Sequence, residues 1–233
     1  MKLAIIGHGA MGKLVRTLAE AEGHEVGRVI TSREAARGMD ELVELLGGHD
    51  VAVDFSVATA VLTNVEAAAR AGVPLVEGTT GWSDGEAEAR RLVAAHAGAL
   101  VYGANFSIGV NLFYRIVARA AELFAAADYA PFIEEAHHAR KRDAPSGTAL
   151  KLRDVLAAHV ARDIPVASTR AGHIPGTHRV GFDSAADQII LTHTARTREG
   201  FAAGALLAAR WIIDRRGVYE FSEAIDSIVT GDG

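Results

Sequence analysis

Proton-transfer groups, cations and a turn that could bind an anion lie together in residues 135–148. His137, His138 and Lys141 can exchange protons near neutral pH, since two imidazoles and an ammonium share one short stretch. The turn at 146–148 opens a helical pattern, and the free N–H groups at the start of a helix bind carboxylate or phosphate. The segment therefore predicts a site that binds a small anion and moves protons.

The charge of the whole chain favours binding over an ordinary surface. Acidic residues outnumber basic ones by 29 to 24, which gives a formal net charge of −5. The basic run from His137 to Arg142 is thus a local positive potential in an acidic protein. On these residues alone, an N-cap beside a solvated surface stays open as the plain alternative.

A metal site is another interpretation of clustered histidines, and the chain has ten of them. No H-E-x-x-H or similar ligand spacing occurs, and a dication would compete with Lys141 and Arg142. We therefore expect no metal. The absence of cysteine removes thiolate catalysis, redox motifs and thiolate metal sites from consideration.

Length and composition suit a globular enzyme of one large domain or two small ones, with 233 residues of which 49% are hydrophobic. No apolar run reaches the ~18 to 20 residues that span a bilayer, and the first apolar run meets Gly7 too early for a signal peptide. We expect a cytoplasmic protein, in agreement with the lack of cysteine. The acidic balance argues against nucleic acid as a partner.

The elements that must position the site begin with a strand, a glycine loop and a helix. A short aliphatic run, Lys2 to Ile6, leads into a G-x-G-x-x-G loop and then a helical pattern. In such a loop the first glycine makes a tight turn, the second lets the backbone approach a pyrophosphate, and the third lets helix pack on strand. The pattern predicts that a dinucleotide binds at Gly7, His8, Gly9, Ala10, Met11, Gly12 and Lys13.

Further strand candidates recur at the spacing of an α/β protein, separated by alanine-rich helical stretches. The strands are expected at 25–30, 51–56, 73–77 and 99–102. This order predicts a Rossmann-type, doubly wound parallel sheet, in which ligands bind at the turns that follow the strands. Two of those turns should border the nicotinamide end of a dinucleotide, through Gly78, Thr79, Thr80, Gly103, Ala104, Asn105 and Phe106.

The pattern changes from about Ser107 onward. Polar and apolar residues alternate in later runs, as they do in half-buried antiparallel strands, and these runs are 177–183 and 188–195. A strand candidate at 129–138 carries the two adjacent histidines, and helices are expected at 110–127 and 148–160. The chain should thus form a second, α+β domain with a mixed or antiparallel sheet.

A helical tail from Gly200 is expected to return to the first domain. We therefore predict a dinucleotide-binding domain of residues 1–106 plus 200–233. The second domain, residues 107–199, would bind the substrate and mediate oligomerisation.

Together these motifs resemble the bacterial dihydrodipicolinate reductase family, the 4-hydroxy-tetrahydrodipicolinate reductases of lysine biosynthesis. The resemblance covers nearly the whole chain, and its most specific part is the E-A-H-H-x-x-K-x-D-A-P-S-G-T-A run that starts at Glu135. The other matching motifs are the glycine loop, Asp54-Phe55-Ser56, Gly78-Thr79-Thr80-Gly81, the run from Ala104 to Asn111, and Phe201-Ala202-x-Gly204-Ala205.

The resemblance implies hydride transfer from NADH or NADPH to C4 of an unsaturated ring dicarboxylate, with loss of water from 4-hydroxy-tetrahydrodipicolinate, giving tetrahydrodipicolinate. It implies that His137 is the acid/base histidine, Lys141 the proton donor and His138 a substrate contact. It also implies a cradle for the substrate carboxylate at the start of the following helix, formed by Ser146, Gly147 and Thr148.

The assembly implied by the resemblance is a homotetramer joined through the sheet of the second domain. The chain departs from longer family members near Arg170, where they carry a longer loop. This shortened segment bears on the contacts between subunits.

The choice between NADH and NADPH depends on the end of the second strand. An NAD-selective fold places Asp or Glu there, whereas this chain continues with Thr31, Ser32 and Arg33. Glu34 lies close enough to serve if the strand ends later, but Arg33, helped by Lys13, suits a 2′-phosphate. We expect both cofactors to be used, with NADPH at least as good as NADH.

Two other functions stay open on the residues alone. A different oxidoreductase of a small anionic substrate could use the same architecture, although it would not need a basic loop beside an anion-binding turn for two carboxylates. A dinucleotide-sensing protein without catalysis would bind the cofactor but show no turnover.

Overall fold

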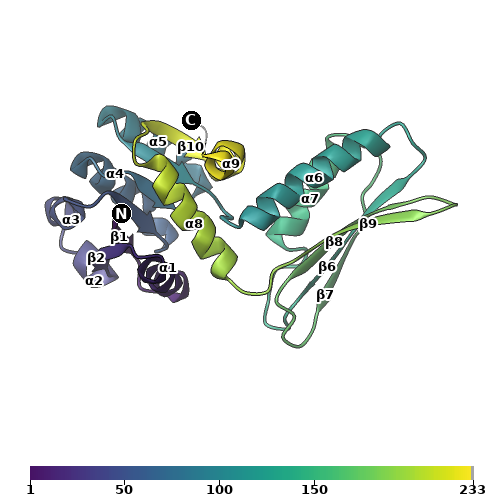
Figure 1. Ribbon diagram of the computed structural model, residues 1–233, viewed down its shortest axis with the longest axis horizontal. Helices are drawn as coiled ribbons and strands as arrows, with labels where there is room; N and C mark the ends of the chain where they lie inside the picture. The colour runs from purple at the N-terminus through teal and green to yellow at the C-terminus, as the bar shows by residue number, and fades with distance from the viewer. Residues whose placement is uncertain (232–233) are drawn as a thin grey trace. The chain divides into compact units, whose positions relative to one another are not determined.

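The computed structural model describes residues 1–231, which divide into two units (Figure 1). Unit 1 consists of Met1–Ile108 together with the segment that begins at Glu199. Unit 2 is Gly109–Arg198. The chain thus leaves the first unit once and returns to it, so the first unit is built from two separate stretches of sequence.

Unit 1 is organised around a six-stranded sheet in the order β10-β5-β4-β3-β1-β2, and all neighbouring strands are parallel. The strands are β1 Lys2–Ile6, β2 Glu25–Ile30, β3 Val51–Asp54, β4 Leu75–Glu77, β5 Ala99–Tyr102 and β10 Gly217–Glu220. Parallel neighbours need crossover connections, usually helices. The helices are α1 Ala10–Ala21, α2 Ser32–Ala35, α3 Met39–Leu46, α4 Val61–Ala71, α5 Glu86–Ala95, α8 Glu199–Ile212 and α9 Phe221–Thr230.

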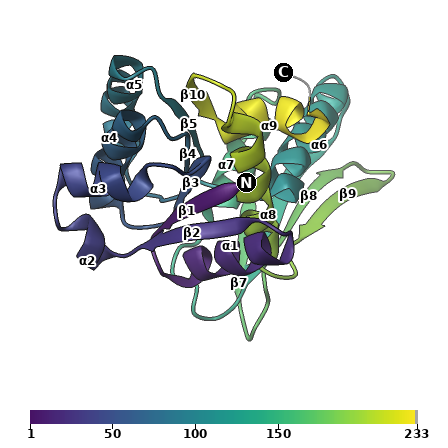
Figure 2. The same cartoon turned by 60° about the vertical axis from the view of Figure 1, so that its left-hand side comes forward.

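Helices cover both faces of this sheet, which confirms the predicted doubly wound fold. Figure 2 shows α3, α4 and α5 on one side of the strands and α1 and α8 on the other. Successive side chains of β1 enter two different cores: Leu3 and Ile5 pack with α1, α8 and α9, while Ala4 and Ile6 pack with α3, α4 and α5. A strand that is buried on both faces reads as a continuous apolar run, as β1 does.

Unit 2 contains a four-stranded sheet in the order β7-β6-β8-β9. Its elements are α6 Ile108–Phe124, β6 Ala130–His137, α7 Gly147–Ala157, β7 Val166–Arg170, β8 Thr177–Asp183 and β9 Gln188–Thr194. β6 pairs parallel with β7 and antiparallel with β8, so the sheet is mixed, as predicted. One face packs on α6 and α7 through Ile133, Val180, Phe113, Leu152 and Leu156.

The outer face of the same sheet carries polar and exposed side chains. Glu134 of β6 faces Arg179 of β8 in an exposed ion pair, and Ile190 of β9 is 47% exposed. A buried face and an open face are thus separated in β6 and β8, whereas β9 has no buried residue.

Several elements were not predicted from the sequence. β7 reads V-A-S-T-R and β10 reads G-V-Y-E, so neither has the aliphatic run or the polar–apolar alternation that marks the other strands. The predicted strand at 129–138 ends at His137, and the helix that follows the basic loop begins at Gly147. These boundaries decide which site residues belong to regular structure.

Candidate active site

The glycine loop of unit 1 is too crowded for side chains at two of its three glycines. Gly7 has φ +95°, and a Cβ there would lie 2.6 Å from the Phe55 carbonyl oxygen. A Cβ on Gly12 would lie 2.1 Å from the Gly7 carbonyl oxygen. The loop therefore requires glycine at both positions, for backbone conformation at Gly7 and for close helix packing at Gly12.

The start of α1 is open in the way an anion site requires. Gly9 is the N-cap and has no side chain to bond the first turn, while a Cβ there would meet nothing within 4 Å. Exposed residues flank it, namely His8, Ala10 and Lys13. Because the first N–H groups of a helix lack partners within the helix, this arrangement fits the pyrophosphate of a dinucleotide.

The end of β2 holds the groups that bear on cofactor choice. Thr31 donates its N–H and hydroxyl to Glu34 at 2.9 and 3.0 Å, and Arg28 donates to the other carboxylate oxygen at 2.9 Å. These bonds, led by the Thr31 N–H, lower the pKa of Glu34. The Glu34 carboxylate is thus occupied within the protein, whereas Arg33 is exposed.

A buried pair of carboxyl groups lies at the ends of β3 and β4, next to the first predicted nicotinamide turn. Asp54 and Glu77 are neighbours in the β3–β4 register, and neither is exposed to solvent. Burial, followed by the charge of Asp54, raises the pKa of Glu77 well above its ordinary value. The raised pKa favours the protonated form of Glu77, which can donate to Asp54.

The same pair fixes the turns that follow the strands. Asp54 accepts from the Ser56 N–H at 2.7 Å and from the Asn64 amide at 2.6 Å, while Glu77 accepts from the Thr79 N–H at 2.6 Å. The Ser56 N–H also reaches the Thr79 hydroxyl at 3.1 Å. Thr79 is consequently turned inward, and Thr80 beside it is exposed.

The second predicted nicotinamide turn, Gly103 to Phe106, offers mainly its backbone and an amide. The Phe106 side chain is 1% exposed and packs against Phe55 and Phe221, so it belongs to the core and can offer a ligand only its backbone. Asn105 accepts from the Ser107 N–H at 2.9 Å. Gly103 donates to the Glu77 carbonyl at 3.1 Å, which ties this turn to the previous one, and Ala104 is exposed.

In unit 2, β6 places Glu135 and His137 on the same face, because they are two residues apart on a strand. Both are buried, and His137 Nδ1 forms an ion pair with Glu135 Oε2. Arg170 Nη2 donates to Glu135 Oε1 at 2.7 Å. Burial opposes ionisation, but the Arg170 and Ser168 hydrogen bonds and the nearby positive charges bring the pKa of Glu135 to about 2.

Two imidazoles meet in this part of the site. The His137 and His178 rings are 5.0 Å apart, centroid to centroid, at 69°. Burial lowers the pKa of His137 although Glu135 opposes the shift, and burial with the charge of His137 lowers the pKa of His178 to about 4. His178 is therefore neutral at pH 7, and it shares a 3.1 Å hydrogen bond with Ser146.

The predicted anion cradle is the N-terminus of α7. Ser146 is the N-cap, and its hydroxyl accepts from the Ala149 N–H at 3.2 Å, so this hydroxyl serves the helix and His178 rather than open space. The N–H groups of Gly147 and Thr148 have no partner within residues 1–231. Gly147 is exposed, with nothing within 4 Å of a Cβ placed on it.

The basic loop between β6 and α7 carries the other two predicted groups. His138 is the first residue after β6, and its carbonyl accepts from the Lys141 N–H at 3.0 Å. The Lys141 ammonium is 2.8 Å from Asp143, with its side chain one-quarter exposed. One short loop of unit 2, which carries Lys141, thus connects His137 at the end of β6 with the N-terminus of α7.

Glu135, His137 and His178 also offer donor atoms within 4.8 Å of one another, which is the spacing of a metal site. Both oxygens of Glu135 are already engaged, one by Arg170 and one by His137. A bound cation would have to displace the His137 contact and would lie close to a guanidinium. The donor set therefore favours a proton-transfer site over a metal site.

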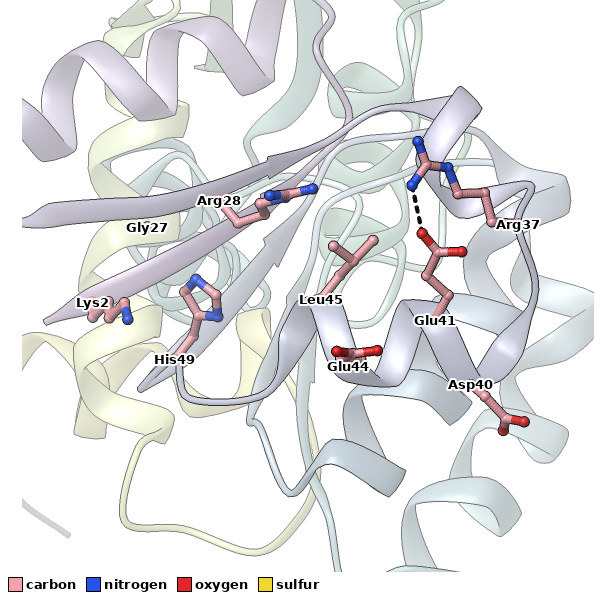
Figure 3. Close-up of a pocket in the computed structure, with 9 residues that line it drawn as sticks. All are labelled: Lys2, Gly27, Arg28, Arg37, Asp40, Glu41, Glu44, Leu45 and His49. Atoms are coloured by element: carbon pink, nitrogen blue, oxygen red, sulfur yellow. Dashed lines mark hydrogen bonds and ion pairs between the residues drawn. The ribbon is translucent and has the colours of Figure 1, made fainter.

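A hollow of about 580 Å³ in unit 1 lies away from the glycine loop (Figure 3). Its walls carry charged and polar side chains from β2, α3 and their flanks, including Arg28, Glu44 and His49. Arg37 and Glu41 pair across 2.5 Å at one end. None of the predicted site residues lines this hollow, so it is not assigned to the dinucleotide.

Three contacting residues were given no role from the sequence: Glu135, Arg170 and His178. The period-two spacing of Glu135 and His137 was a usable signal, because a strand through them puts both side chains on one face. Arg170 and His178 lie more than 30 residues further along the chain, and only the pairing of β6 with β7 and β8 brings them in.

Comparison with known proteins gives a consistent result over the whole chain. The family profile described as dihydrodipicolinate reductase, N-terminus, matches residues 1–106, and the one described as dihydrodipicolinate reductase, C-terminus, matches residues 109–225. A 4-hydroxy-tetrahydrodipicolinate reductase of Christiangramia forsetii is 32% identical, covering 98% of this chain and 99% of its own length. One from Archaeoglobus fulgidus is 35% identical, covering 97% and 100%.

Solved structures share the fold. Dipicolinate-bound dihydrodipicolinate reductase from Paenisporosarcina sp. TG-14 superposes with a TM-score of 0.79 at 20% identity, covering 96% of this chain and 98% of that one. An amine dehydrogenase from Mycobacterium smegmatis gives a TM-score of 0.59 at 12% identity, covering 93% and 94%. Within residues 1–231, no helix is long and apolar enough to cross a membrane.

Proposed function

The chain belongs to the dihydrodipicolinate reductase family, and from that premise we propose how its two units share the reaction. The enzyme is an NAD(P)H-dependent oxidoreductase that reduces 4-hydroxy-tetrahydrodipicolinate to tetrahydrodipicolinate in lysine biosynthesis. In our proposal unit 1 binds the dinucleotide and unit 2 binds the ring dicarboxylate and supplies the proton.

We assign the dicarboxylate to unit 2 because the open N-terminus of α7 lies beside the basic loop. Two free N–H groups, those of Gly147 and Thr148, start a helix four residues after the Asp143 that pairs with Lys141. A helix N-terminus and an ammonium both attract a carboxylate. The substrate is a dianion, so matched positive charge stabilises it, and His138 extends the same loop toward it.

In unit 1 the dinucleotide would be held by the open N–H groups at the start of α1 and by the turns after β4 and β5. When bound, it supplies the hydride that C4 of the ring accepts. Gly9 leaves room for the pyrophosphate, and Thr80 and Asn105 offer polar groups to the nicotinamide end. Phe106 contributes from its backbone, since its side chain is in the core.

Reduction of a conjugated imine leaves an electron-rich enamine that must gain a proton. We assign this proton to Lys141, whose side chain is partly exposed at the loop, and acid/base support to His137. His137 Nδ1 is occupied by Glu135, so Nε2 is the nitrogen available to a ligand.

One assay tests the function. We expect the purified protein to oxidise NADPH, followed by absorbance at the nicotinamide band, only when the freshly formed ring dicarboxylate is present. Pyridine-2,6-dicarboxylate, the planar compound bound by the Paenisporosarcina relative, should compete with that substrate. No oxidation with the dicarboxylate, together with oxidation of an unrelated imine or keto acid, would identify a different oxidoreductase.

We further propose that both cofactors are used and that NADPH is at least as good as NADH. The Glu34 carboxylate is taken up by Thr31 and Arg28, so it is a poor partner for ribose hydroxyls. Arg33 and Lys13 are exposed cations near the second strand and the glycine loop, and an arginine fork suits a 2′-phosphate.

Arg33→Ala should raise KM for NADPH about tenfold and leave KM for NADH within twofold, because only NADPH has the phosphate. The comparison is kcat/KM for each cofactor in the wild type and the variant. Arg16→Ala, which removes an exposed arginine of α1 paired with Glu20, is the matched control. If the wild type preferred NADH and Arg33→Ala left that preference unchanged, Arg33 would not contact the cofactor and the ribose would be bound by other groups.

Finally, we propose a cytoplasmic homotetramer joined through the sheet of unit 2. The outer face of that sheet has an apolar centre, where the Phe132 ring lies over Gly181 and Ile190 is exposed in the adjacent register position. A reaction that consumes a nicotinamide dinucleotide agrees with the cytoplasm. Sedimentation velocity of the purified protein measures the assembly directly.

A further inference from the structure

Arg170 connects strand β6 with the basic loop that follows it. It is the last residue of β7, and in the parallel β6–β7 register it lies opposite His137. Its Nη2 atom donates to Glu135 Oε1 at 2.7 Å and to the Asp143 carbonyl at 2.5 Å. Glu135 belongs to the strand and Asp143 to the loop, so a single guanidinium nitrogen joins them.

Each of these two acceptors holds one proton-transfer group. Glu135 contacts His137 Nδ1 through its second oxygen. Asp143 pairs with the Lys141 ammonium at 2.8 Å. The contacts therefore run in sequence from His137 through Glu135, Arg170 and Asp143 to Lys141.

We propose that Arg170 is a positioning residue for both groups: through Glu135 it fixes the ring of His137, and through Asp143 it fixes the loop that carries Lys141. The proposal rests on the roles assigned above to His137 and Lys141. Glu135 is the intermediate member, and its carboxylate keeps the proton of His137 on Nδ1, which leaves Nε2 free to act.

The burial of these groups supports a positioning role over a surface ion pair. The Glu135 side chain has no solvent exposure and that of Arg170 has 16%, whereas exposed ion pairs contribute little. Gly176 adds a steric argument. A Cβ there would lie 3.2 to 3.3 Å from the His137 ring, so a glycine keeps space beside the edge that carries Nε2.

The test compares Arg170→Lys, Arg170→Met and Glu135→Gln with the wild type. We expect kcat to fall about tenfold or more in each, with KM for the dinucleotide within twofold. A lysine lacks the planar guanidinium, whose second nitrogen also donates to the Thr169 carbonyl at 2.8 Å, so it cannot hold the same geometry. Arg179→Met is the matched control, since Arg179 pairs with Glu134 on the exposed face of the same sheet. Its kcat should stay within twofold of wild type.

The pKa of His137, followed by NMR through its ring proton, gives a readout that simple loss of stability would not produce. The groups that face His137 are Glu135 of β6, Lys141 of the loop, Arg170 of β7 and His178 of β8. Glu135→Gln removes the carboxylate that opposes burial, so this pKa should fall. Arg170→Met removes a cation, so it should rise.

Variants of His137 and Lys141 distinguish a failure of the proposed function from a failure of the role proposed for Arg170. If His137→Ala and Lys141→Ala retain normal turnover, the proposed roles fail first. If those two variants are impaired while all three test variants behave like Arg179→Met in kcat and in the pKa of His137, Arg170 is not a positioning residue. If Arg170→Met does not fold, Arg170→Lys and Glu135→Gln give the same decision.

Discussion

Replacing Lys141 or His137 by alanine is expected to lower kcat by about 10² to 10⁴, the usual range for the loss of an acid/base group. Each change removes a group that contacts the substrate ring in the proposed reaction. Neither residue belongs to unit 1, where the glycine loop lies, so the affinity for the dinucleotide should stay within about twofold. Steady-state rates and a fluorescence titration of the bound cofactor measure the two quantities.

Matched controls come from the same unit. Lys151 and His159 are exposed residues of α7 and of the segment just after it, and alanine at either should leave kcat unchanged. The double variant without Lys141 and His137 gives the clearest decision. If it turns over the dicarboxylate at a near-normal rate, the proton comes from another group.

The fold was accessible from sequence where hydrophobic runs and glycine positions agree. β1 has a continuous aliphatic run because both of its faces are buried, and the glycine loop follows it at once. The mixed sheet of unit 2 was also anticipated, since β8 and β9 alternate. β7, Val166–Arg170, was missed because it is mostly polar after its first two residues and largely exposed at the edge of the sheet.

The candidate site was accessible only in its local part. A motif within fourteen residues names His137, Lys141 and the start of α7, and a resemblance to a family adds roles to them. The partners of these residues depend on strand pairing. Arg170 reaches Glu135 across 35 positions of sequence, and no local spacing records that contact. Charge and burial, which set the pKa of Glu135 and of His178, follow from the same pairing.

Phe106 shows what sequence position leaves open about a predicted site residue. Its place after β5 predicts a ligand contact, yet the ring packs between Phe55 and Phe221. A turn at the end of a parallel strand must also close the core beneath it, and an aromatic residue serves that purpose. Sequence position alone does not separate the residues that face a ligand from those that support the turn.

Alanine substitution of Gly12 and of Gly9 in the glycine loop should affect different properties. Gly12→Ala should lower the stability of the protein, whereas Gly9→Ala should weaken dinucleotide binding. Gly12→Ala puts a Cβ 2.1 Å from the Gly7 carbonyl, so the backbone must move and packing of α1 on β1 is lost. We expect a loss of about 2 to 3 kcal/mol of stability, which corresponds to a fall in Tm of roughly 4 to 12 °C. Calorimetry without cofactor measures it.

Gly9→Ala leaves the empty protein nearly unchanged, because Gly9 has φ −76° and nothing lies within 4 Å of its Cβ. An alanine N-cap costs at most about 1 kcal/mol. The methyl group does occupy the space in which the proposed pyrophosphate meets the N–H groups of α1, so Kd for NADPH should rise at least about tenfold. If Gly9→Ala bound NADPH as tightly as the wild type, the phosphates would lie elsewhere and the open start of α1 would have only a structural role. A fall in Tm as large as that of Gly12→Ala would instead show that Gly9 is needed for folding.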